Sequence, residues 1–91
     1  MTGGSYRVEL LPPARRAVAE RLPEAVAAAV LEFCAGLAND PGRVGKPLFG
    51  PLEGCHGARR GTYRVVYRID QVNRLVSVLD IAHRRDVYGH R

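Results

Sequence analysis

The segment that decides the fold is TYRVVYRID, residues 62–70, in which two kinds of side chain alternate. A period of two is typical of a β-strand that buries one of its faces. The face expected to be buried carries Tyr63, Val65, Tyr67 and Ile69. The opposite face carries Arg64, Val66 and Arg68. We therefore expect a sheet with one covered side and one open, basic side.

Strands are also predicted on both sides of this segment. Residues 75–82 (LVSVLDIA) are nearly all apolar, and residues 71–74 are a suitable hairpin connection to them. Near the start of the chain, residues 6–10 (YRVEL) alternate apolar and charged side chains, which indicates a short first strand.

Two helices are predicted between the first strand and the glycine-rich middle of the chain. Pro12 and Pro13 suit the first turn of a helix that ends near Leu22. Pro23 suits the start of a second helix, whose apolar stripe is formed by Val26, Val30, Phe33 and Leu37, with Cys34 beside it as a core residue. Small alanines let the two helices pack as a hairpin on one face of the sheet.

Residues 42–57 contain five glycines and two prolines, which leaves two interpretations open: a long ordered loop or one irregular strand. The predicted fold class is α+β, with an antiparallel sheet of about four strands and an N-terminal two-helix hairpin on one face. At 91 residues, we expect one domain spanning residues 1–91, with residues 1–5 flexible.

The positive charge is concentrated in the second half of the chain. Residues 1–42 hold four basic and five acidic residues, whereas residues 43–91 hold ten basic and four acidic ones. Thirteen of the fourteen basic residues are arginine, whose planar guanidinium matches phosphate oxygens at two points. This pattern favours an acidic polymer as the partner, and the alternative is a solvated surface in an arginine-rich protein.

No apolar run approaches the roughly 20 residues that cross a bilayer, and no secretory signal precedes the first strand. We therefore expect a cytoplasmic protein that is not in a membrane.

Two segments carry a resemblance to a known family. GTYRVVYRI, residues 61–69, and DIAHRRDVY, residues 80–88, resemble the two signature segments of the RelE/ParE superfamily of bacterial toxins, and the predicted order of elements matches over roughly residues 6–88. The ending HRRDVY is similar to the RelE branch, whose members cut messenger RNA in the ribosomal decoding site. The resemblance implies a toxin of a type II toxin-antitoxin system, a ribosome-dependent endoribonuclease held in check by a cognate antitoxin and needing no cofactor.

The chemistry of metal-independent RNA cleavage assigns roles to several residues. The 2′-hydroxyl attacks the phosphate, so the reaction needs a base, positive charge on the pentacovalent phosphate and an acid at the leaving oxygen. Arg64, on the open face of a rigid strand, is the first choice to stabilise that phosphate, the alternative being a solvated strand charge. His83 is a candidate acid or base, although a histidine at a strand end is more often a surface residue.

The resemblance adds two residues to the catalytic set. Arg84 matches an arginine that the family uses near the leaving group or the phosphate, and Tyr88 matches a tyrosine that stacks on or orients the substrate nucleotide. Further RNA contacts are expected from the remaining arginines near these segments, Arg59, Arg60, Arg68 and Arg85.

The chain also departs from the family pattern. Relatives carry lysines where this sequence has Cys55 and Gly57, and Lys46 is too far upstream in sequence to be assumed equivalent. The general base is therefore unassigned, with His56 a candidate. Cys55 and His56 form a lone adjacent pair without the second pair of a zinc site, so no metal is predicted.

Two alternatives to a ribonuclease remain open. The first is a ParE-like toxin that binds DNA gyrase without catalysis, which the missing lysines favour. The second is an RNA-binding homologue that has lost its activity.

Overall fold

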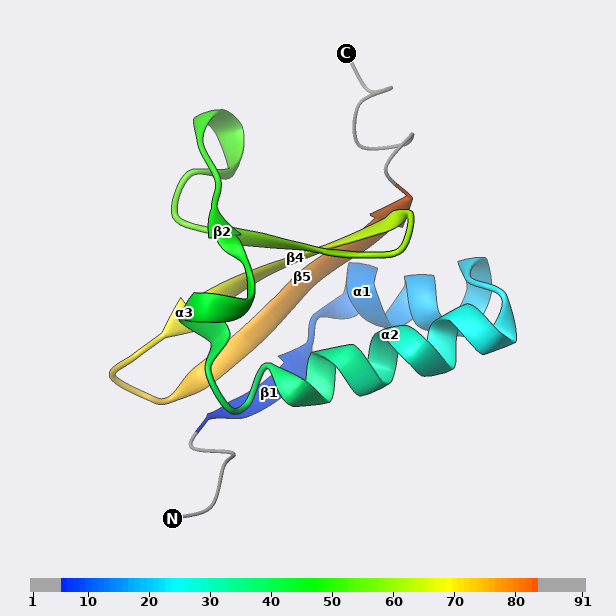
Figure 1. Ribbon diagram of the computed structural model, residues 1–91, viewed down its shortest axis with the longest axis horizontal. Helices are drawn as coiled ribbons and strands as arrows, with labels where there is room; N and C mark the ends of the chain where they lie inside the picture. The colour runs from blue at the N-terminus through cyan, green and yellow to red at the C-terminus, as the bar shows by residue number, and fades with distance from the viewer. Residues whose placement is uncertain (1–5, 84–91) are drawn as a thin grey trace.

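The computed structural model describes residues 6–83, in which helices cover one face of a five-stranded sheet (Figure 1). The elements follow the chain as β1 (Arg7–Leu10), α1 (Pro12–Arg16), the π-helix η1 (Ala17–Arg21), α2 (Glu24–Gly36), α3 (Pro41–Val44), β2 (Lys46–Pro47), the 3₁₀ turn η2 (Gly50–Leu52), β3 (His56–Arg60), β4 (Tyr63–Asp70) and β5 (Leu75–His83). The predicted α+β class and the helix hairpin are confirmed.

The sheet differs from the prediction in strand count and in one pairing. Its order is β1-β5-β4-β3-β2, so it has five strands rather than about four. β1 pairs with β5 in parallel, while the other neighbours are antiparallel. Two neighbouring parallel strands need a long connection. Here the helices and the strands β2, β3 and β4 lie between β1 and β5 in the chain, and β5 then returns beside β1 (Figure 1). The segment 42–57, left open as a loop or an irregular strand, supplies β2, β3 and a helical turn.

The core lies between the sheet and the helices. From the sheet it takes Val65, Tyr67, Val76, Val78 and Ile81, all fully or almost fully buried. From the helices it takes the small side chains Ala14 and Ala17 together with Val30, Cys34 and Leu37. The core positions of Val65, Tyr67 and Cys34 are thus confirmed, while Tyr63 and Ile69 are half-buried. The open face predicted for β4 is wrong at Val66, which is also buried. Burial raises the pKa of the Cys34 thiol to about 11.

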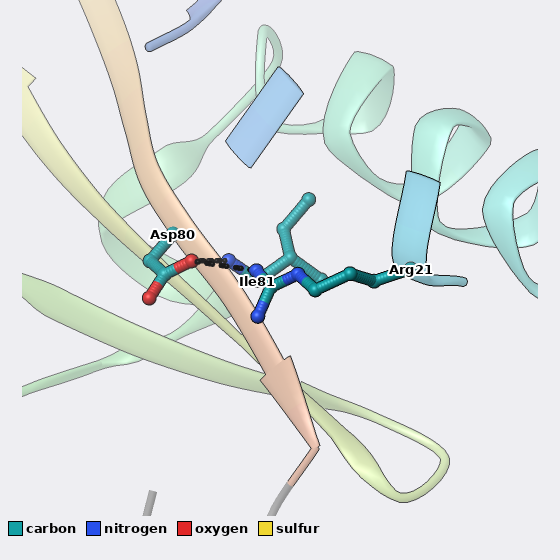
Figure 2. Close-up of polar contacts among 3 residues, drawn as sticks. All are labelled: Arg21, Asp80 and Ile81. Carbon is teal, nitrogen blue, oxygen red and sulfur yellow. Dashed lines mark hydrogen bonds and ion pairs between the residues drawn. The ribbon is translucent and has the colours of Figure 1, made fainter. Parts of the chain in front are cut away.

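A bulge in β5 changes which side chains face the helices. Val66 pairs with Asp80 and Tyr67 with Val78, so β5 contains one more residue than β4 at this point. The Asp80 carboxylate accepts the backbone N–H of Ile81 at 2.8 Å and lies 3.6 Å from the Arg21 guanidinium (Figure 2). Beyond the bulge the alternation resumes one residue out of step, and Ile81 is buried like Val76 and Val78.

Across residues 6–83, the helices are all too short or too polar to span a membrane.

Candidate functional site

A groove of about 520 Å³ opens where β2 meets β3 and β4, and it collects positive charge. Its walls come from residues 44–48, residues 57–59 and Arg64. Three of these residues are cations, namely Lys46, Arg59 and Arg64, and none of the groove's described lining residues is acidic. The volume falls in the range of roughly 300–1,000 Å³ typical of ligand sites, so the groove suits an anionic ligand of nucleotide size.

Two of the cations face each other across neighbouring strands. Arg59 of β3 is paired directly with Arg64 of β4, which puts both guanidiniums on the same face of the sheet. Like charges at directly opposed positions destabilise a sheet. An anion bound between them would be attracted by both guanidiniums, so the pair suits a phosphate.

The third cation, Lys46, is distant in sequence from the arginine pair. Lys46 lies on β2, a two-residue edge strand, and pairs with Gly57 of β3. Gly57 stands two residues before Arg59, on the same face of β3, so the lysine comes into the groove beside the arginine pair. Lys46 is too far upstream in the sequence for this position to be inferred, and only the strand pairing reveals it.

The β2 segment is held in place by close backbone packing under Tyr67. The buried Tyr67 hydroxyl donates to the Pro41 carbonyl at 2.6 Å. A Cβ on Gly45 would lie 2.6 Å from the same hydroxyl oxygen and 2.7 Å from the Gly57 carbonyl oxygen, so only glycine fits there. Burial raises the pKa of Tyr67, and a backbone hydrogen bond with Gly45 opposes that shift. This contact fixes the backbone that carries Lys46.

Other predicted RNA contacts lie away from this groove. Arg60 pairs with Tyr63 and lines a separate apolar groove beside α2, on the helix-covered side of the sheet. Arg68 pairs with Ser77 and shares the open face of β4 with Arg64, but it does not line the groove. The structure thus brings Arg59 and Arg64 together and separates Arg60 and Arg68 from them.

His83 also lies on the helix-covered side. Its ring packs edge-on against Tyr63, with 5.2 Å between ring centroids, and both rings line a small cavity of about 90 Å³ that includes Arg21. The bulge in β5 puts His83 opposite Tyr63, whereas an unbroken alternation would have put it on the face of Arg64. Three further predicted residues, Arg84, Arg85 and Tyr88, lie outside the described residues.

His56, the candidate base, is paired with Tyr67 and stacks on its ring at 5.6 Å between centroids. It therefore points to the covered face of β3, away from the arginine pair. Its Nδ1 atom is buried and finds no hydrogen-bond partner among residues 6–83. In the same range, no three His, Cys, Asp or Glu side chains gather as metal ligands.

Comparison with known proteins gives consistent matches over nearly the whole chain. The family model described as ParE toxin of type II toxin-antitoxin system, parDE, matches residues 9–88. The chain is 50% identical to toxin RelE of Mycobacterium tuberculosis (strain ATCC 25618 / H37Rv), covering 91% of this chain and 86% of that protein. It is 48% identical to toxin RelG of the same organism, covering 91% and 95% of the two chains.

Among solved structures, the fold matches the crystal structure of the toxin-antitoxin complex RelBE2 from Mycobacterium tuberculosis. The TM-score is 0.80 at 47% sequence identity, and the match covers 86% of this chain and 96% of that one.

Proposed function

Since this chain belongs to the ParE toxin family and is a RelE-like toxin of a type II toxin-antitoxin system, we propose that it stops translation by cutting messenger RNA on the ribosome. The proposed reaction is a metal-independent endoribonuclease cleavage in the cytoplasm, carried out by one domain that spans residues 1–91. The observation that carries the proposal is the groove in which Arg59 and Arg64 oppose each other.

In this reaction the 2′-hydroxyl oxygen of the RNA attacks the adjacent phosphorus, and the bond to the 5′-oxygen of the next nucleotide breaks. The pentacovalent phosphate carries more negative charge than the ground state. Two guanidiniums fixed on a rigid sheet can donate to its oxygens without reorganising, which lowers the barrier. We assign this role to Arg64, with Arg59 as its partner across the strands.

The remaining roles are assigned by resemblance and position. Arg84 would act near the leaving oxygen, and Tyr88 would stack on or orient the nucleotide. His83 is a weaker candidate acid or base, because it packs against Tyr63 on the helix-covered side and does not line the groove. Arg60, Arg68 and Arg85 would contact the RNA or the ribosome outside the groove. The general base is unassigned, and His56 is a weaker candidate because it stacks on Tyr67 on the covered face.

The expected protein partner is a cognate antitoxin, supported by the likeness to a toxin solved as a complex with its antitoxin. We propose that the antitoxin places carboxylates against the basic groove and apolar side chains beside the helix hairpin. Such a partner would block access to Arg59 and Arg64.

The test is primer extension on message from cells in which the toxin is induced, and on message bound to purified ribosomes. The proposal expects new 5′-ends at codons in the decoding site, which vanish when the cognate antitoxin is supplied. Intact message during full growth arrest would contradict it.

A second candidate function is binding and poisoning of DNA gyrase, which the family model's ParE description favours. It predicts inhibition of purified gyrase in a supercoiling assay together with intact message. A homologue that has lost catalysis would give neither result.

A further inference from the structure

We propose that Lys46 binds the phosphate next to the scissile one and so holds the RNA strand in register over the arginine pair. This inference rests on the proposed function, because it takes single-stranded RNA as the ligand of the groove. It adds a binding residue that comes from an edge strand outside both signature segments.

The fold holds the backbone of Lys46 beside the groove. Lys46 pairs with Gly57, and the next backbone contact along this ladder, from the Leu48 N–H to the Cys55 carbonyl at 2.9 Å, closes the connection between β2 and β3. On the other side, Gly45 is packed against Tyr67 and the Gly57 carbonyl. The backbone of Lys46 is thus fixed on both sides, while its side chain remains exposed in the groove.

The groove holds more positive charge than one phosphodiester needs. A phosphodiester carries one negative charge, and the opposed guanidiniums of Arg59 and Arg64 already provide two positive charges for it. Lys46 stands beside Gly57, two residues from Arg59, which is roughly 7 Å along the strand. A third cation at that separation suits a neighbouring phosphate of the same strand better than a third contact to the same one.

The acidic side chain near Lys46 in the sequence, Asp40, pairs with Arg43. Within residues 6–83, Arg43 of the same segment is 3.9 Å from Asp40, whereas Lys46 takes part in neither of the ion pairs found there. A lysine is a mobile point charge, suited to hold a phosphate without fixing its orientation. The arginines of the pair are the better groups for the reacting phosphate.

These separate roles for Lys46 and the arginine pair predict separate effects on binding and on the maximal rate. A contact to a phosphate that does not react is equally strong in the ground state and the transition state, so its loss weakens binding without slowing the chemical step. In cleavage of ribosome-bound message with toxin in excess, Lys46→Ala is expected to raise the half-saturating toxin concentration about tenfold, with the maximal rate within about threefold of the parent. Lys46→Arg is expected to restore binding.

A second readout is the salt dependence of binding to a single-stranded RNA oligonucleotide made uncleavable by 2′-deoxy substitution. Loss of one phosphate contact lowers the slope of log Kd against log salt by about 0.7 for a single strand. Lys46→Ala should show this drop, and Lys46→Gln should match it. Arg43→Ala is the control, because Arg43 lies in the same segment and does not line the groove; its slope should equal that of the parent.

The outcomes separate this inference from the proposed function. If Arg64→Ala abolishes cleavage but Lys46→Ala leaves half-saturation and salt slope unchanged, the role of Lys46 is refuted and the ribonuclease stands. If Lys46→Ala slows the maximal rate as much as Arg64→Ala does, Lys46 acts on the reacting phosphate and the neighbouring-phosphate assignment is wrong. If the parent protein cuts no ribosome-bound message, the proposed function fails, and this inference fails with it.

Discussion

The two faces of the β4–β5 hairpin differ in what constrains their side chains, although residues of the two faces alternate along the same strands. On the covered face, Val65, Tyr67, Val76 and Val78 have no solvent exposure, and shape and volume decide what fits. On the groove face, Arg64 stands opposite Arg59 of β3, and both line the groove, where charge decides what binds. Substitutions on the covered face should therefore impair folding. Substitutions on the groove face should reduce activity in a protein that still folds.

The largest expected effect is on the groove face. Arg64→Ala removes a donor to the developing charge, and loss of one such donor slows catalysis by about 100- to 1,000-fold. The free energy of unfolding should change by less than about 0.5 kcal/mol, because Arg64 lies outside the core that contains Val65 and Tyr67. Single-turnover cleavage of ribosome-bound message and urea denaturation measure the two quantities.

The control for this prediction is Arg16→Ala, which removes an exposed arginine on α1 and lowers the net charge equally. It should cleave at the parent rate. If Arg64→Ala cleaves as fast as Arg16→Ala, Arg64 does not belong to the site. The two faces would then not differ in function.

This contrast also explains what the sequence could and could not predict. The alternation in β4 is regular, so the covered residues Val65 and Tyr67 and the open position of Arg64 follow from the pattern. The face of His83 does not, because the bulge in β5 shifts the alternation and no glycine or proline marks it. A nearly continuous apolar strand hides such a shift, since either register buries an apolar residue.

The position of Lys46 was hidden for another reason. A strand of two residues is too short to show any periodicity, and its pairing with Gly57 depends on how the intervening loop closes. The signal in the sequence was the glycine on each side of the pairing, at positions 45 and 57, where close packing excludes a side chain. Glycines alone, however, indicate a turn as readily as a close approach of two strands.

The next largest effect tests the packing that joins the two faces. Gly45→Ala would put a Cβ 2.7 Å from the Gly57 carbonyl oxygen, a backbone atom that cannot rotate away. We expect a loss of about 1–3 kcal/mol in the free energy of unfolding, as for other overpacked sites. Because β2 must shift, RNA binding through Lys46 should weaken as well.

Gly42→Ala is the matched control, since no atom lies within 4 Å of the added Cβ and α3 tolerates alanine there. It should be neutral or slightly stabilising. Equal stability of the two alanine variants in urea denaturation would show that β2 does not depend on close packing at Gly45.

A smaller effect is expected from the hydroxyl beneath the groove. Tyr67→Phe leaves the Pro41 carbonyl without its donor and should cost about 1–2 kcal/mol at pH 7. Tyr63→Phe, which keeps the ring beside His83, should cost less than about 0.5 kcal/mol. Urea denaturation of both variants and the parent measures this difference.

The same hydroxyl gives a pH dependence of known sign. Burial raises the pKa of Tyr67 above its ordinary value of 10.0, so above that pH the unfolded chain loses the proton before the folded one does. The stability that this group provides is complete below pH 10 and declines as the pH rises further. Cys34 is present in parent and variant alike, so its own titration cancels. The stability difference between the parent and Tyr67→Phe should therefore narrow from pH 9 to pH 11, and a widening gap would contradict this sign.

The smallest effect concerns the bulge that decides the face of His83. Arg21 and Asp80 are about half exposed and 3.6 Å apart, so water and salt screen their attraction and Arg21→Ala should cost less than about 0.5 kcal/mol. Asp80→Ala also removes the acceptor for the Ile81 N–H and should cost about 1 kcal/mol. Urea denaturation in low and high salt separates the two contributions, because only the ion pair is sensitive to salt. If Arg21→Ala proves as costly as Asp80→Ala, the ion pair rather than the backbone contact stabilises the bulge, and the covered face would then depend on surface charge as much as the groove does.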